Sequence, residues 1–420
     1  MPGNHEQIVL SLIRDAIKDT PFENHVFLVG GAVRDELMGF AIKDIDLCVD
    51  IPNGGIELAE WITLQLNGKH TKLNPLRFPA YGIGKFYLKS YPEVKVECAQ
   101  TRKEIYNNPE SRNPITTFAN ISEDCFRRDL TINALYKNIS TDEVLDFTRW
   151  GLPDLKNHII RTPREPFITF NEDALRELRV IRFASRFQWQ IEAGTLKGIA
   201  DNAQRLETIT QDRITEEIGK ILLTPKPSLG LSLLRDCGLL QYTIKEIDKI
   251  TISIWQNLLN LIDNCLPELE CRLAALFSST NDEKLVLQRL NFPVTTIKRA
   301  VEIKKLYLEL NTVPAPVIEP EIRRWQMRCG GNWDAVLSLL HTTNPATATH
   351  LQEKTVCMIQ EGSACFEMRL PLNGQDIIQH FNLKPGPAIK MLLEKAQAHY
   401  FENPFISKDE CLNLLQHELD

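Results

Sequence analysis

Two aspartates separated by one residue, Asp44 and Asp46, are the first residues of this 420-residue chain with an evident chemical use. They lie in an alternating segment, and side chains at positions i and i+2 of a strand point to the same face. Carboxylates held this close repel one another unless a cation lies between them. Mg²⁺ suits such a pair, because it takes one or two carboxylates and completes its shell with water and substrate phosphates. The alternative is an edge strand with two solvated acids, the commoner meaning of so short a motif.

A glycine turn that suits a phosphate comes directly before this pair. The apolar run at 26–29 stops at Gly30 and Gly31, and a short helical pattern follows. Glycines let the backbone approach a ligand closely, and the free N–H groups at the start of a helix bind phosphate. Arg34 could make a forked contact to the same phosphate. Together with the aspartates, these residues predict a nucleotidyl-transfer site.

Two downstream segments supply further charged candidates. A strand is predicted at 94–101 and contains Glu97, which becomes a third acid if that strand pairs beside the aspartates. The alternation around Glu97 leaves its face open, so an exposed strand glutamate is the alternative. A helix is predicted at 126–138, and its first turn contains Arg127 and Arg128. These arginines could bind a triphosphate, or they could be solvated side chains on the surface.

The stretch 171–187 is predicted as one well-buried helix with a charged stripe. Neighbours at i and i+3 touch on a helix surface, and four charged residues follow that spacing: Asp173, Arg176, Arg179 and Arg182. Arginines on a buried helix need an anionic partner. An aspartate beside an arginine can also offer an acceptor and donors to the edge of a base. The alternative is an internal salt-bridge ladder with Glu172 and Glu177.

The remaining pattern predicts an α+β fold, a mixed β-sheet head followed by an all-α region. Hydrophobic periodicity predicts amphipathic helices at 5–18, 54–66 and 211–223, strands at 80–88 and 144–147, a turn that includes Pro92, and a long loop at 103–120. From Gly151 onward the pattern is almost wholly helical. A proline-rich linker at 312–321 separates the last helices from those before them.

The amino-acid composition indicates the broad class of protein but not its function. The chain has 43% hydrophobic and 25% charged residues, a net charge of −7, and ten cysteines with no Cys-x-x-Cys pair. These values predict an ordinary globular protein with reduced thiols, located in the cytoplasm. A negative net charge does not indicate nucleic-acid binding. Basic residues with interleaved tryptophans do gather around the linker, either as an RNA-backbone surface or as a charged helix face.

Taken together, the motifs resemble the class II branch of the tRNA nucleotidyltransferase and poly(A) polymerase family, and most closely a CCA-adding enzyme. The resemblance covers residues 26–223 in family order: GGAVRD with DID, VECAQTR, RRDLTINA, GLPDL, EDALRELRVIRFASRF and RITEEIGKIL. The segment 370–397 also looks like the family's C-terminal region. No single one of these motifs would carry the assignment, but their order does.

The resemblance implies a catalytic nucleotidyltransferase head at 1–150, then a helical neck at 151–224, a body at 225–313 and a tail at 314–420. Asp44 and Asp46 would hold two Mg²⁺ ions, and Glu97 would be the third catalytic carboxylate. The nucleotide-binding residues would be Gly30, Gly31, Arg34, Arg128, Asp173, Arg176, Arg179 and Arg182. Among them, Asp173 and Arg176 would pair with the edge of the incoming base. Residues 103–120 match a flexible loop involved in the family's change of specificity.

The implied activity is addition of C, C and A to the 3′ end of tRNA from CTP and ATP, without a nucleic-acid template. The tail would dock on tRNA, and the oligomeric state stays open. Within the family, a poly(A) polymerase or a C-only or A-only enzyme is the alternative. Bacterial poly(A) polymerases carry a Gly-Arg-Arg-Phe-like signature, which Gly84, Lys85 and Phe86 match only in part. A catalytically silent RNA-binding protein is the alternative from another class, and the intact acids argue against it.

Overall fold

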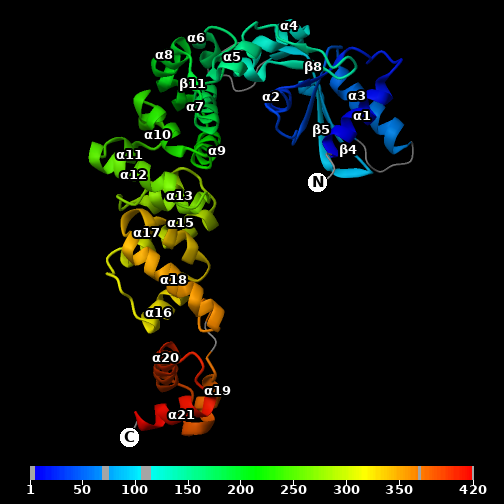
Figure 1. Ribbon diagram of the computed structural model, residues 1–420. Helices are drawn as coiled ribbons and strands as arrows, with labels where there is room; N and C mark the ends of the chain where they lie inside the picture. Colours follow the sequence, from blue (N-terminus) through cyan, green and yellow to red (C-terminus); the bar gives the residue numbers. More distant parts are fainter. Residues whose placement is uncertain (1–4, 69–74, 106–114, 368–369, 419–420) are drawn as a thin grey trace. The chain divides into compact units, whose positions relative to one another are not determined.

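The computed structural model describes residues 5–68, 75–105, 115–367 and 370–418, and the chain separates into two compact units (Figure 1). The first unit comprises Met1–Ile221 and Leu229–Thr243, and the second comprises Leu222–Ser228 and Ile244–Asp420. The β-rich part and the first neck helices therefore belong to one unit. The fourfold division into head, neck, body and tail stays a prediction.

A seven-stranded mixed sheet forms the frame of the first unit, in the order β3-β4-β5-β2-β1-β8-β9. β2 and β5 pair in parallel, and the other neighbours pair antiparallel. The predicted mixed-sheet head is thus confirmed. The strands are β1 (Val26–Val29), β2 (Ile45–Val49), β3 (Leu76–Phe78), β4 (Ile83–Leu88), β5 (Tyr91–Gln100), β8 (Tyr136–Asn138) and β9 (Val144–Leu145).

One face of this sheet is covered by α1 (His5–Ile17) and α3 (Gly54–Ile62), both close to their predicted ranges. Alternate residues of β2 and β5 point into the core beneath them, including Leu47, Val96 and Cys98. α1 contributes the apolar stripe Val9, Ile13 and Ile17, spaced to lie on one side of the helix. This face is closed to solvent, so any side chain of the sheet that contacts a substrate must point to the opposite face.

The opposite face carries a smaller apolar cluster under α4 (Ile121–Asp124), built around Phe27, Cys48 and Tyr136. The helix predicted at 126–138 is wrong. That segment forms two short 3-10 turns, Cys125–Arg127 and Thr131–Asn133, and then strand β8. Arg128 has an extended backbone, with φ −74° and ψ 163°, which breaks the helical pattern between the turns.

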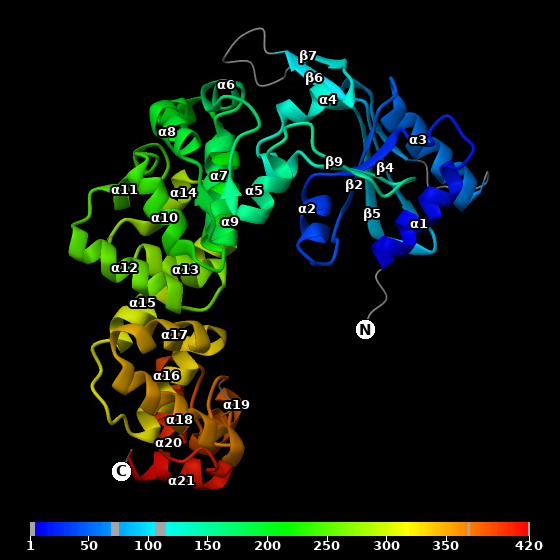
Figure 2. The same cartoon turned by 45° about the horizontal axis from the view of Figure 1, so that its top comes forward.

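The ends of the predicted loop at 103–120 are also ordered differently. β6 (Arg102–Ile105) and β7 (Ile115–Phe118) pair antiparallel and form a separate sheet, which lies beside α4 in Figure 2. Residues 106–114 lie outside the described residues. Pro92 lies within β5 rather than in the turn before it, a place where a missing N–H is tolerated because it is close to the strand's start.

The first unit contains further helices, one between β1 and β2 and the others after β9. These are α2 (Gly31–Leu37), directly after β1, and then α5 (Gly151–Asn157), α6 (Pro166–Glu172), α7 (Leu175–Phe187), α8 (Ala193–Asn202), α9 (Gln211–Leu222) and α10 (Pro227–Asp236). A two-stranded parallel pair, β10 (Ile159–Ile160) with β11 (Gln190–Ile191), lies among them. The single helix predicted at 171–187 is two helices, because the extended Asp173 (φ −152°, ψ 103°) separates α6 from α7.

Within its described residues the second unit is helical, in agreement with the prediction. Its helices are α11 (Lys245–Asp248), α12 (Ile252–Asn264), α13 (Leu269–Leu276), α14 (Glu283–Arg289), α15 (Val294–Leu310), α16 (Glu319–Cys329), α17 (Trp333–Thr343), α18 (Pro345–Glu361), α19 (Gly374–Phe381), α20 (Pro387–Glu402) and α21 (Lys408–His417). Part of the basic cluster around the linker is structural: Lys304 pairs with Glu283, and Arg323 is buried against the Phe401 carbonyl. None of the described helices combines the length and apolarity that a membrane crossing requires.

Candidate active site

Asp46 and Glu97 lie side by side on the sheet face that α1 and α3 leave open. β2 and β5 are parallel neighbours, and these two residues are register partners, so their side chains point the same way. Val94, Val96 and Cys98 fill the core on the other side of β5. The face of Glu97, which alternation alone leaves open, is therefore settled by the register. Asp44 immediately precedes β2 and completes the set of three acids.

The acids act on one another electrostatically. Desolvation first, and then the charges of Glu97 and Asp44, raise the pKa of Asp46 above its ordinary value. Lys85, the register partner of Glu97 on β4, lies with its Nζ 2.6 Å from a Glu97 carboxylate oxygen. The Lys85 and Arg128 charges oppose the rise in the pKa of Asp46. The cluster is thus anionic, with its charge only partly balanced by the chain itself.

This donor set fits Mg²⁺ bound by two aspartates better than a cage made wholly of protein. No group of three acid, histidine or cysteine side chains converges on one point in the part of the chain that the structure describes. Mg²⁺ needs no such cage, because it uses one or two carboxylates and takes other oxygens from water and phosphates. The repulsion felt by Asp46 is the feature that a bound cation would relieve.

The turn at Gly30 brings the main chain close to Arg128. Gly30 has φ 67° and ψ −132°, a conformation that favours glycine, and α2 begins directly after it. A Cβ placed on Gly30 would lie 3.6 Å from the Arg128 guanidinium. The glycine turn, Arg128 and Asp46 therefore belong to one region, as the sequence predicts. Gly31 lies beside Arg34, whose nearest guanidinium nitrogen would be 3.3 Å from an added Cβ.

Arg128 is held in place by Asp124, a residue that sequence reasoning missed. The buried Asp124 carboxylate accepts hydrogen bonds from the side chains of Arg127, Arg128 and Tyr136 and from the backbone N–H of Arg102. Burial acts to raise the pKa of Asp124, but Arg127 and Arg128 outweigh it and hold the pKa at about 2. The Tyr136 ring also lies against the Arg128 guanidinium, 4.8 Å from its centroid.

Arg34 is buried rather than exposed toward solvent. Its guanidinium binds Asp35 and the side-chain oxygen of Asn133, and it lies 5.1 Å from the ring centroids of both Phe183 and Phe187. The predicted phosphate contact of Arg34 therefore stays a prediction. What the structure adds is a direct link between α2 and the α7 rings, which seats the glycine turn against α7.

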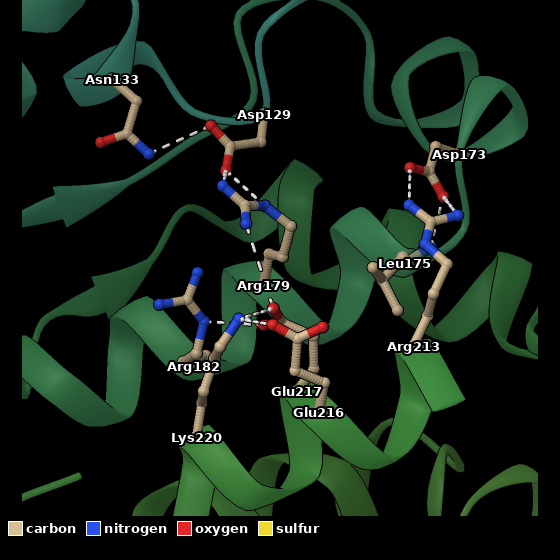
Figure 3. A network of polar contacts seen from close by, with 10 residues as sticks. All are labelled: Asp129, Asn133, Asp173, Leu175, Arg179, Arg182, Arg213, Glu216, Glu217 and Lys220. Atoms are coloured by element: carbon tan, nitrogen blue, oxygen red, sulfur yellow. Dashed lines mark hydrogen bonds and ion pairs between the residues drawn. The ribbon is translucent and has the colours of Figure 1, made fainter. Parts of the chain in front are cut away.

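Asp173 lies at the junction of α6 and α7, where its carboxylate is already engaged. It accepts a hydrogen bond from the Leu175 backbone N–H, and Arg213 of α9 donates to its two oxygens at 2.8 and 3.4 Å (Figure 3). Arg213 belongs to the RITEEIGKIL motif, but its partner could not be read from the sequence. The base-edge role of Asp173 would require this ion pair to open or to share the carboxylate.

Arg176 joins α7 to α6 and to the Arg127–Arg128 segment. Its guanidinium donates to the carbonyls of Thr169 and Arg127 and to the Glu172 carboxylate, and the residue is 7% exposed. Part of the predicted salt-bridge ladder is therefore present, through Glu172. Arg176 also brings the 171–187 stretch into contact with the Arg127–Arg128 segment, two regions that the sequence presents about fifty residues apart.

Arg179 and Arg182 lie in a polar network that joins the 129–133 segment, α7 and α9 (Figure 3). Arg179 donates to Asp129, which also binds Asn133, and Arg182 donates to Glu217 at 2.7 Å. Burial acts to raise the pKa of Asp129, but Arg179 and Asn133 outweigh it and lower the pKa. The three-residue spacing in the sequence predicted Arg179 and Arg182 as site residues. It did not predict their acidic partners, Asp129 and Glu217. The RITEEIGKIL motif held the only signal for Glu217, as an acid one turn after Arg213.

Glu177 of α7 is another residue that the sequence did not single out for chemistry. It is fully buried, and neither carboxylate oxygen has a hydrogen-bond partner among the described residues. Burial raises the pKa of Glu177 to about 9, partly opposed by Arg205 and increased by Asp173. Glu177 is thus a neutral acid at neutral pH, and the predicted ladder does not include it.

We expect Glu177→Gln to remove a pH dependence of folding. The pKa of Glu177 in the folded chain lies above the unfolded value, so the wild-type chain loses stability as pH rises between the two values. From about pH 6 to about pH 8, the free energy of unfolding of the variant should gain about 2.7 kcal/mol relative to wild type. Urea unfolding at both pH values measures this gain. A constant difference between the two proteins would contradict it, and Glu216→Gln, at an exposed position, is the control.

Family models match two parts of the chain. One, described as a poly A polymerase head domain, matches residues 26–161. Another, described as a probable RNA and SrmB-binding site of polymerase A, matches residues 189–251. These two matches cover the sheet with its acids and the helices α8 to α11.

Similar proteins include a CCA tRNA nucleotidyltransferase, mitochondrial, of Candida glabrata, 38% identical over 50% of this chain and 41% of that protein. The tRNA nucleotidyltransferase cca2 of Schizosaccharomyces pombe is 24% identical over 93% of this chain and 92% of its own length. The match thus spans less than half of the first of these relatives. A crystal structure of the Bacillus stearothermophilus CCA-adding enzyme in complex with CTP has the same fold, with TM-score 0.75 and 22% identity, covering 100% of this chain and 98% of that one.

Proposed function

The chain belongs to the tRNA nucleotidyltransferase and poly(A) polymerase family, and we propose that it adds C, C and A to the 3′ end of tRNA. CTP and ATP are the proposed donors, and pyrophosphate is the product that leaves. The cytoplasm is the expected location, although the Candida glabrata relative is named as a mitochondrial protein.

One observation carries this proposal: Asp46 and Glu97 are register partners on an open sheet face, with Asp44 and Arg128 acting on the same carboxylate. A protein that only binds RNA gains nothing from acids that repel each other. A relative that matches more than nine-tenths of both chains and is named a tRNA nucleotidyltransferase supports the same class of reaction.

The reaction proposed for this face is an in-line attack on a nucleotide. The 3′-hydroxyl oxygen of the RNA attacks the α-phosphorus, the bond to the bridging oxygen breaks, and the pyrophosphate leaves with the electron pair. Asp44 and Asp46 would hold Mg²⁺, which when bound stabilises charge on the attacking and leaving oxygens. Glu97 would accept the hydroxyl proton or share in metal binding, and Arg128 would bind the phosphates.

Selection of the base falls to Asp173 and Arg176. C and A both present an amino donor beside a ring-nitrogen acceptor on their pairing edges, which an aspartate and an arginine can match, whereas U and G do not. Asp173 would exchange part of its bond to Arg213 for the amino group. Arg179 and Arg182 would border the same pocket from α7, backed by Asp129 and Glu217.

A poly(A) polymerase, or an enzyme that adds only C or only A, is the second candidate. The model that matches the head carries the poly A polymerase description, and Lys85 supplies one basic residue of the polymerase-like signature. In the structure Lys85 is bound to Glu97, so its charge acts on the acid cluster. This contact does not distinguish CCA addition from poly(A) or partial addition. The reaction products must distinguish them.

We expect three added nucleotides and then a stop when the protein and Mg²⁺ act on tRNA that lacks its CCA end. The tRNA is supplied with CTP alone, ATP alone or both, and the products are separated on a sequencing gel. Addition of two C residues with CTP alone and of the final A only with both donors would support CCA addition.

The other outcomes separate the alternatives. A long A tail on generic RNA would replace the proposal with a poly(A) polymerase, and addition of C alone or A alone would replace it with a partial enzyme. RNA binding with no transfer under any donor would replace it with a silent binding protein. A tRNA that already ends in CCA is the control, and it should gain nothing.

A further inference from the structure

One side chain from each of the strands β3, β4, β5 and β2 forms a row of register partners, here called a rung. The rung crosses the sheet from its outer edge to the acids. Leu76 of β3 is the register partner of Lys85, Lys85 of Glu97, and Glu97 of Asp46. Register partners on neighbouring strands point to the same face. The edge strand β3 therefore presents side chains on the face that holds the proposed chemistry.

The outer end of this face is apolar and open. Leu76 is 57% exposed and Phe78, two residues further along β3, is 42% exposed. Phe78 belongs to the next rung on the same face, with Ile83, Ala99 and Cys48 as successive partners. The inner end of that rung, at Cys48, is buried with Phe27 under α4. Its outer end, at Phe78, is exposed.

Lys85 connects the open ring to the acids. Its Nζ lies 5.5 Å from the centre of the Phe78 ring and 2.6 Å from a Glu97 oxygen. An aromatic ring beside a cation is the combination that binds single-stranded nucleic acid, because bases stack on the ring and phosphates approach the charge. Three strand spacings, about 14 Å in all, separate β3 from β2, so a short unpaired end can cover both.

We propose that Phe78, with Leu76 and Lys85 beside it, is the surface on which the unpaired 3′ end of the RNA substrate stacks before its hydroxyl reaches the acids. This inference rests on the proposed function and names where the acceptor strand lies. The incoming nucleotide is assigned to Asp173 and Arg176 on the neck helices, so it does not compete for this surface. An unpaired RNA end is the occupant because the surface is continuous with the acids that its hydroxyl must reach.

The test compares Phe78→Leu, which keeps an apolar side chain but removes the ring, with Phe78→Trp, which keeps a ring. Binding of a fluorescently labelled tRNA without its CCA end is measured by anisotropy with no nucleotide present. Phe78→Leu should weaken binding and raise the KM for RNA about tenfold, with the KM for CTP unchanged, and Phe78→Trp should restore both. Phe167→Leu, at an exposed aromatic of α6, is the matched control and should change neither.

Unchanged RNA binding in Phe78→Leu, or a rise in the KM for CTP instead, would overturn the inference. If the leucine variant fails to fold, the wild-type protein still decides: 4-thiouridine at the RNA 3′ end should photo-crosslink to residues 76–78, and crosslinks only elsewhere would refute the surface. Failure of the proposed function looks different, since the wild-type protein would then transfer no nucleotide although the binding and crosslinking measurements remain possible.

Discussion

The Asp46→Asn variant should fold normally and add nucleotides at least about a thousandfold more slowly than the wild-type chain. The substitution removes a carboxylate from the pair proposed to hold Mg²⁺ while keeping the size of the side chain. Because Asp46 is desolvated and is repelled by Glu97 and Asp44, its neutralisation relieves repulsion within the sheet. The variant should therefore melt at the same temperature as the wild-type chain or higher.

Both halves of this expectation can be measured separately. Single-turnover incorporation of labelled CTP into tRNA gives the rate, and a thermal melt gives the stability. Glu93→Gln changes another acid on β5, one that binds His5 at an exposed site, and should alter neither value by much. A rate within tenfold of wild type, or a clear fall in melting temperature, would show that Asp46 has a structural role instead.

Arg176→Ala is expected to lower the preference for CTP over UTP by about ten- to a hundredfold, more than it slows the transfer of CTP itself. A well-placed pair of hydrogen bonds to a base edge discriminates by about 1 to 3 kcal/mol, which corresponds to this range. The variant should also lose stability, because Arg176 donates to the Thr169 and Arg127 carbonyls at a nearly buried position. Unpaired buried carbonyls cost about 1 to 3 kcal/mol each.

The preference is taken as the ratio of kcat/KM for the two nucleotides within one protein, so a reduced folded fraction cancels from it. Arg186→Ala is the control, since Arg186 lies on the same helix, stacks on Phe187 and falls outside the three-residue stripe. If the Arg176 variant kept the wild-type ratio while melting earlier, its only role would be to fasten α6 and α7 to the head.

Local patterns were sufficient for the parts of the site that depend on neighbours in sequence. The buried run of β1 followed by two glycines predicted the strand and the turn, and the three-residue spacing predicted that Arg179 and Arg182 share a helix face. The position of Glu97 required the pairing of β2 with β5, which joins segments fifty residues apart. No periodicity in either strand contains that information.

Patterns failed where long-range bonds override local preference. The residues around Arg127 and Arg128 have helical spacing, yet Asp124 ties them to Tyr136 and to the start of β6, and the chain turns twice instead. At Asp173, the bond to Arg213 lies at the point where the predicted helix breaks. Both departures lie at proposed functional residues, where local rules are most often broken.

The bonds of Arg176 have a consequence for how this chain could evolve. One guanidinium is proposed to read the base, and the same group fastens the neck helices to the carbonyl of Arg127. A lineage that altered its base preference at this position would weaken its fold in the same step. Because folded proteins tolerate only a small loss of stability, such a change would have to follow stabilising substitutions elsewhere. Laboratory selection for a new nucleotide should therefore start from a stabilised parent.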